Sequence, residues 1–135
     1  MRKRPGTTLA RRILAGPILA GASLAFALAA PALAHHSYAM FDAQQNKQLE
    51  GTVEAFKWSN PHSYIEVLVM DDKGQTQKWT AECGSPAQMV KAGWRSTSLK
   101  PGDHVVVTVH PLRSGEFGGS FVQVQTADGH VLKAS

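Results

Sequence analysis

The sequence contains a single cysteine, Cys83, among its 135 residues, which limits both its covalent structure and its chemistry. One thiol cannot form an internal disulfide, so the domain must be stabilised by its apolar core even in an oxidising compartment. We expect Cys83 to behave as a small buried hydrophobic side chain. A catalytic thiol is the alternative, although no sequence signature of a cysteine enzyme surrounds it.

Other catalytic signatures are also missing. No glycine-rich phosphate loop follows a predicted strand, and no partner acid or nucleophile is spaced to match Glu50 and Glu54. Ser85 has no accompanying base and fits a helix cap better than a nucleophile. These absences favour a protein that is not an enzyme.

Acidic residues are missing from the first 34 positions, whereas five basic residues lie within the first twelve. Removing this segment lowers Lys+Arg from 14 to 9 against 10 Asp+Glu, which leaves a net charge of −1. The remainder has no cluster of Lys and Arg of the kind that binds phosphates. The composition therefore indicates a targeting signal and excludes nucleic acid as a partner.

The N-terminal segment has the three parts of a signal peptide. An apolar run from Ile13 to Ala30 follows the basic start, and Ala32-Leu33-Ala34 matches the small-x-small pattern of signal peptidase. We expect cleavage after Ala34, with no stable membrane insertion afterwards, and a periplasmic or secreted location. Arg11-Arg12 leaves the twin-arginine route open beside the general secretory route, and an uncleaved anchor is the alternative to cleavage.

The remaining chain is predicted to divide into a flexible lead-in, residues 35–46, and one β-rich domain, residues 47–135. Alternating apolar residues such as Val105, Val107 and Val109 indicate strands. Turn residues separate strands at about 47–58, 62–70, 75–83, 104–110, 120–126 and 130–133. The apolar phase changes at Phe56 in the first of these, which suggests a bulge.

A short helix is expected after the third strand. Ser85 fits the N-cap, Pro86 the first helical position and Gln88 the capping-box partner. Gly93 is a natural C-terminal stop. Apolar contacts are expected from Met89, Val90 and Trp94.

Three strands, one helix and two or three further strands follow the order of an OB-fold, a small five- to six-stranded Greek-key barrel. An open β-sandwich is the main alternative. The three tryptophans are assigned to core and helix packing, with Trp58 the most exposed. Trp58 and the neighbouring Asn60 are candidates for a binding face, because aromatic side chains on an OB-fold can stack on ligands.

Several blocks of residues resemble a family of small exported bacterial proteins of unknown function, domain of unknown function 6152. The blocks are His35-His36-Ser37, Phe41-Asp42, Trp58-Ser59-Asn60-Pro61-His62, Gly84-Ser85-Pro86, Gly93-Trp94 and Ser98-Leu99-Lys100-Pro101-Gly102-Asp103. The resemblance implies an exported single domain and no catalytic residues. The layout is also similar to periplasmic OB-fold modules such as the haem chaperone of cytochrome maturation, whose haem-attaching histidine has no counterpart here.

Cleavage after Ala34 would make His35 the first residue of the mature protein. Its free amine and imidazole could chelate a metal together, because an α-amine with a pKa of about 7.7–8 releases its proton readily to a metal. His36 adds a second imidazole, and His62 could add another through folding. Such a nitrogen-rich site suits Cu(II) best. The alternative is that the paired histidines are simply polar residues at the terminus.

His62 follows the turn residues Asn60 and Pro61, so its ring could line the mouth of the barrel beside Trp58. The simpler interpretation is that Asn60 and Pro61 make the turn and His62 opens the next strand. The leading functional hypothesis is a non-enzymatic envelope binding or accessory module that holds copper. A metal-free protein-interaction module, docking by a strand edge or by the loops around Trp58 and Pro111–Gly119, is the alternative, and a small enzyme using Cys83 is a weaker one.

Overall fold

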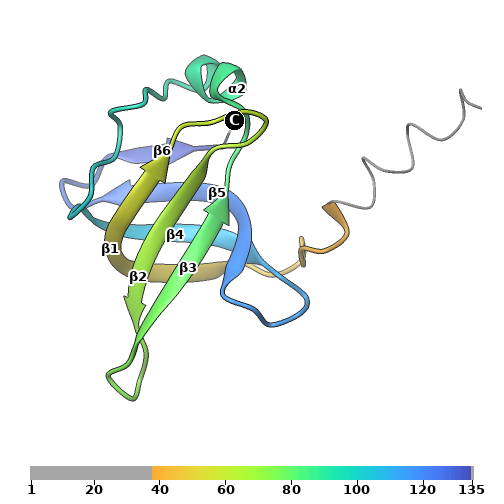
Figure 1. The fold of residues 1–135 in the computed structure, drawn as a ribbon, viewed down its shortest axis with the longest axis vertical. Coiled ribbons are helices and arrows are strands. Elements are labelled where there is room, and N and C mark those ends of the chain that lie inside the picture. Colours follow the sequence, from red (N-terminus) through yellow and green to blue (C-terminus); the bar gives the residue numbers. More distant parts are fainter. Residues whose placement is uncertain (1–37, 135) are drawn as a thin grey trace, which may run out of the picture.

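The computed structural model describes residues 38–134, which form a small β-barrel with one short helix (Figure 1). No helix within these residues is long and apolar enough to span a bilayer. The elements in chain order are β1 (Lys47–Lys57), β2 (Tyr64–Met70), β3 (Thr76–Glu82), α2 (Pro86–Lys91), β4 (His104–Pro111), β5 (Gly118–Thr126) and β6 (Val131–Lys133).

The strands form one sheet in the order β3-β2-β1-β4-β5-β6, and a parallel pairing of β3 with β5 closes the first five into a barrel. This closing pair is short, with Thr80 opposite Gly118 and Glu82 opposite Ser120. All other neighbours are antiparallel. The predicted OB-like barrel, with its helix between the third and fourth strands, is confirmed, and an open sandwich is not what forms.

Strand β1 bends sharply so that it belongs to both sides of the barrel. Its first half pairs with β4 and its second half with β2, and the register against β2 shifts between Val53 and Ala55. This bulge confirms the one expected from the phase change near Phe56. Gly51 lies where the two partners meet, and a Cβ built on it would come within 2.2 Å of the Leu68 carbonyl oxygen. The crossing therefore requires glycine at this position.

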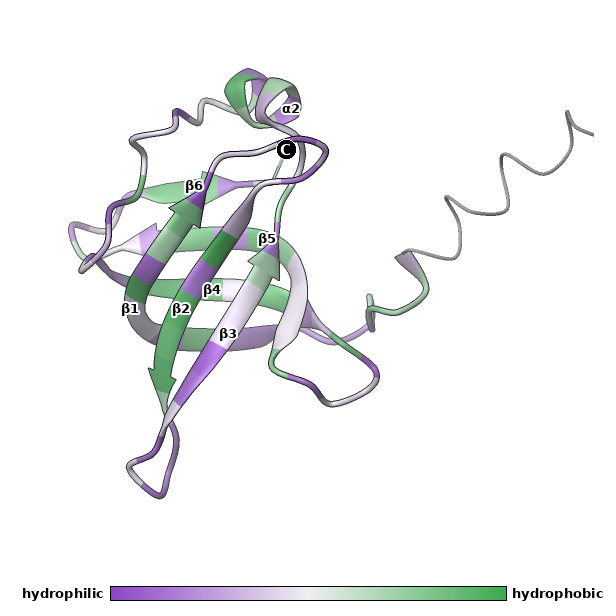
Figure 2. Ribbon diagram, viewed as in Figure 1, coloured by the Kyte–Doolittle hydropathy of each residue, from purple (hydrophilic) through white to green (hydrophobic). Residues whose placement is uncertain are grey.

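The core lies inside the barrel. Figure 2 shows hydrophobic and polar stretches alternating along the strands, as expected when one face of each strand is buried. Val105, Val107 and Val109 of β4 have at most 3% of their surface exposed, as the alternation predicted. The other fully or nearly buried core residues are Leu49, Val53, Ile65, Val67, Trp79, Ala81, Cys83, Met89, Trp94, Leu99, Phe121 and Val124.

Helix α2 has the predicted capping box. The Gln88 amide N–H donates to the Ser85 hydroxyl oxygen, and the Gln88 side-chain oxygen accepts from the Ser85 amide at 3.0 Å. Gly93 follows the helix with φ of 91°. Met89 is buried, but the expected contact of Val90 is wrong, since that side chain is 59% exposed. Consecutive residues on a helix point about 100° apart, so only one of this pair faces the barrel.

Trp94 joins the segment after α2 to the barrel. It is 1% exposed and packs edge-on against Phe121 at 5.4 Å between ring centroids. Its indole N–H donates to the Lys133 carbonyl at 2.8 Å, which ties β6 to this cluster. Trp79 is also buried, while Trp58 is half-buried against Phe56. The predicted packing of the tryptophans, with Trp58 the most exposed, is confirmed.

The residues before β1 are held against the start of the β4–β5 loop, where the sequence suggested only a flexible lead-in. Phe41 is 7% exposed and forms a β-bridge with Leu112. The Asp42 amide donates to the Pro111 carbonyl at 2.8 Å, and the Arg113 amide donates to the Met40 carbonyl at 2.9 Å. This docking holds residues 40–42 against the barrel at the start of the β4–β5 loop. Figure 1 shows these residues beside that loop.

Candidate functional site

A hollow with a largely apolar lining lies between α2 and the docked N-terminal segment. Its volume is about 640 Å³. We call it the His62 cavity and define it by residues from five parts of the chain: Tyr38, Phe41, His62, Glu82, Lys91 and Phe121. Three features bring these distant segments together: the β-bridge of Phe41, the closing pair that contains Glu82, and the capped helix that carries Lys91.

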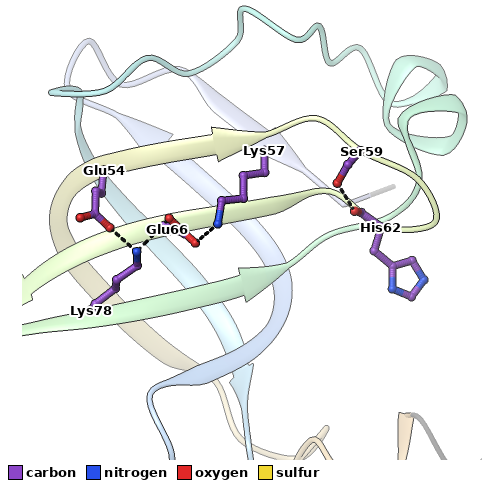
Figure 3. A network of polar contacts seen from close by, with 6 residues as sticks. All are labelled: Glu54, Lys57, Ser59, His62, Glu66 and Lys78. Carbon is purple, nitrogen blue, oxygen red and sulfur yellow. Dashed lines mark hydrogen bonds and ion pairs between the residues drawn. The ribbon is translucent and has the colours of Figure 1, made fainter.

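His62 is held at the rim by two contacts. Its ring Nδ1 contacts the Glu82 carboxylate, and its carbonyl accepts from the Ser59 hydroxyl at 2.8 Å. Figure 3 shows the ring pointing away from the turn that carries it. Because β2 begins at Tyr64, His62 belongs to the turn and does not open the strand. The ring lines the cavity, but not beside Trp58 as one of the two sequence interpretations had it, because Trp58 does not line this cavity.

The contact with Glu82 decides which nitrogen of His62 is available. A carboxylate only accepts hydrogen bonds when ionised, so the neutral ring must carry its proton on Nδ1. The Nε2 lone pair then remains unprotonated. A histidine whose other nitrogen is held by a carboxylate is the usual arrangement of a histidine metal ligand. His62 and Glu82 lie 20 residues apart, so no local sequence pattern predicted their contact.

Cys83 lines the same cavity as a buried thiol. Its surface is 6% exposed, and its Sγ lies 3.8 Å from the Ala81 carbonyl oxygen. Burial, and to a lesser extent the neighbouring charge of Glu82, raises the pKa of Cys83 to about 12. The thiol is therefore protonated near neutral pH, in agreement with its predicted role as a small buried side chain.

Trp58 and Asn60 lie outside the His62 cavity. Trp58 lines a separate hollow of about 370 Å³ beside Val90 and Arg95. Asn60 is exposed in the turn between β1 and β2. Trp58 and Asn60, the two candidates for a binding face, are close in sequence. Neither of them lines the His62 cavity.

The remaining histidines occupy other surfaces. His104 and His130 line one shallow hollow with Asp103 and Asp128, a grouping that the sequence analysis missed. His110 bonds to the Gln45 carbonyl oxygen at 2.8 Å through Nδ1. Across residues 38–134, no three His, Cys, Asp or Glu side chains are placed to hold a metal ion together. His35 and His36 lie outside the described residues.

A second polar cluster covers the outer face of β1, β2 and β3 (Figure 3). Lys78 Nζ lies 2.7 Å from Glu54 and 3.0 Å from Glu66, and Lys57 also pairs with Glu66. Lys57, followed by Lys78, lowers the pKa of the Glu66 carboxyl against the opposing effect of burial. Two lysines balance two glutamates here, so this cluster carries no net charge of its own for steering a charged ligand.

Comparison with known proteins places the chain in a sequence family without adding a function. The sequence model described as "Family of unknown function (DUF6152)" matches residues 24–122, which is most of the chain. No curated protein and no solved structure matches it significantly.

Proposed function

The chain belongs to this family of unknown function, and we propose that it acts as an exported, non-enzymatic binding module that holds copper. The ligands in this proposal are the amine and imidazole of His35, the imidazole of His36 and the ring of His62. The observation that carries it is that Tyr38 and His62 line one cavity. The proposal rests on cleavage after Ala34, which exposes the His35 amine.

The distance from Tyr38 to the proposed terminus is short. Only His35-His36-Ser37 would precede Tyr38, and three residues span at most about 10 Å. Tyr38 and His62 line the same cavity, so in this proposal the three residues carry the terminal nitrogens to the ion that the His62 ring also binds. The docking of Phe41 on Leu112 supports the proposal further, since it keeps the exit point beside the cavity.

His62 is suited to be a ligand. Its Nδ1 is held by Glu82, which leaves Nε2 as the coordinating nitrogen and fixes the plane of the ring. Glu82 also supplies negative charge close to a divalent cation. An amine and imidazoles form a nitrogen-rich ligand set, for which Cu(II) has the highest affinity among the common divalent metals. Bound copper would provide the module with a cargo or a redox-active centre.

The alternative that the structure favours next is a protein-interaction module without metal. Three large apolar side chains, Tyr38, Met40 and Phe117, are between 48% and 58% exposed. Phe117 belongs to the 111–119 loop that was predicted to dock on a partner, and Met40 is tied to the start of that loop through Arg113. A hydrophobic surface of this kind would bind a protein of the cell envelope.

The experiment is a titration of the exported protein with Cu(II), after intact mass has fixed its first residue. We expect His35→Ala and His62→Ala each to weaken copper binding at least tenfold. Glu82→Gln should weaken it about tenfold, as is usual for the partner of a metal-bound histidine. Electron paramagnetic resonance should report several nitrogen ligands.

The matched control is His104→Ala, which removes a histidine from a different hollow and should leave copper affinity unchanged. A mature chain that starts at any residue other than His35 would contradict the proposed site. Equal copper affinity in the wild type, His35→Ala and His62→Ala would also contradict it. In that case capture of an envelope partner that depends on Phe117 would favour the interaction module.

A further inference from the structure

We propose that the His62 cavity also binds the hydrocarbon body of a small amphipathic carboxylate, whose head group pairs with Lys91. This inference concerns the apolar floor of the cavity and is independent of copper. The volume of about 640 Å³ lies within the range of about 300–1,000 Å³ in which proteins bind small molecules.

The floor of the cavity is made of side chains that are apolar or uncharged. Phe41, Cys83 and Phe121 are each less than 10% exposed and reach the wall of the cavity, and Ala92 completes it on the helix side. The Cys83 thiol is protonated near neutral pH and so behaves as a hydrophobic group. Covering this floor with a hydrocarbon chain removes apolar surface from water, and this burial favours binding.

The rim supplies one uncompensated cation. Lys91 lies in the last turn of α2 and lines the cavity. Of the carboxylates in residues 38–134, none forms an ion pair with its ammonium group. Glu82 lines the same cavity and keeps its carboxylate charge against the neutral His62 ring, so the head group of the ligand is assigned to Lys91, with which Glu82 forms no ion pair. Gln88, one turn before Lys91, adds an amide whose oxygen is used by Ser85 and whose NH₂ group can donate. The chemistry at this end therefore suits a carboxylate.

The polar N-terminal residues do not complement this floor. His35, His36 and Ser37 carry imidazole and hydroxyl groups that would need hydrogen-bond partners if they were buried on Phe41 and Phe121. A ligand with an apolar body and one anionic end satisfies both the floor and Lys91. It also leaves the Nε2 atom of His62 at the rim for the metal.

The test is a calorimetric titration of the exported protein with decanoate, below its micellar concentration and in the presence of EDTA so that no metal contributes. We expect saturable binding of one decanoate per chain. Ala92→Phe should fill the cavity and weaken binding more than tenfold. Lys91→Met, a change of an exposed side chain, should weaken decanoate binding about threefold at low salt and leave binding of decanol unchanged.

Lys73→Met is the control, because Lys73 lies in the turn between β2 and β3, away from the cavity, and should bind decanoate as the wild type does. Thermal unfolding of each variant confirms that it is folded. Absence of saturable binding, or unchanged binding to Ala92→Phe, would overturn the proposal. Equal affinity for decanoate and decyltrimethylammonium would overturn the role of Lys91. Binding only to a chain shortened to begin at Tyr38 would assign the cavity to residues 35–37 instead.

Discussion

Trp94→Phe should destabilise the barrel strongly, although both side chains are aromatic. The indole of Trp94 is 1% exposed, and its N–H donates to the Lys133 carbonyl at 2.8 Å. Phenylalanine lacks this donor, and loss of such a hydrogen bond costs about 1 kcal/mol. The smaller ring also leaves space beside Phe121 and Phe56, which costs a further 1–2 kcal/mol, roughly that of one or two buried methylene groups.

The expected loss is therefore about 2–3 kcal/mol of unfolding free energy, to be measured by urea denaturation. For a domain of this size the slope is about 1–1.5 kcal/mol per molar urea, so the midpoint should fall by about 2 M. Far-UV circular dichroism is the appropriate signal, because the variant removes one of the three tryptophans that dominate the fluorescence.

Trp58→Phe is the matched control, since Trp58 is half-buried and its indole N–H forms no hydrogen bond within residues 38–134. Its midpoint should fall by less than about 0.5 M, because Trp58 packs only at the edge of the core and loses no hydrogen bond. A Trp94→Phe midpoint within the same 0.5 M would refute the reasoning. It would mean that neither the bond to Lys133 nor the aromatic cluster holds β6 in place.

Three further predictions follow from buried or paired groups. Because burial raises the pKa of Cys83 to about 12, iodoacetamide should label it at pH 8 only after unfolding, and rapid labelling of the folded protein would contradict this. Lysine neighbours lower the pKa of Glu66, so its contribution to stability is present above the usual carboxyl pKa and is lost as the pH falls. Glu66→Gln should therefore weaken the dependence of the urea midpoint on pH between about 5 and 3; an unchanged dependence would count against the ion pairs. Gly51→Ala should cost more than about 2 kcal/mol, because its Cβ would meet the Leu68 carbonyl oxygen; a midpoint equal to that of the wild type would show that β1 can shift.

The barrel could be predicted from the sequence largely because its local signals agree with its tertiary structure. Val105, Val107 and Val109 alternate with positions that are polar or less buried, and the capping box at Ser85 and Gln88 fixes the start of the helix within one turn. The phase change in β1 located the bulge because a bulge moves every later side chain to the opposite face. These features depend on neighbours in sequence.

The features that the sequence analysis missed depend on distant residues. Glu82 is an ordinary strand residue until the pairing of β2 with β3, which sets Tyr64 opposite Glu82, places it against His62. The docking of Phe41 uses backbone hydrogen bonds to residues 111–113. Nearly every residue carries the same backbone groups, so the sequence does not indicate which of them pair. Val90 was expected to be buried because apolar character alone does not tell which side of a six-residue helix faces the core.

The parallel pair of β3 and β5 has a consequence for the order in which the chain can fold. Its two halves, 80–82 and 118–120, are separated by nearly forty residues, and β5 is the last strand of the barrel. Contacts of this sequence separation form late, because a long loop must first be closed. A chain that has emerged only as far as Phe117 cannot close the barrel, and a fragment ending there should show no cooperative unfolding. For the exported protein that we propose, the chain would stay open to translocation until β5 had been made.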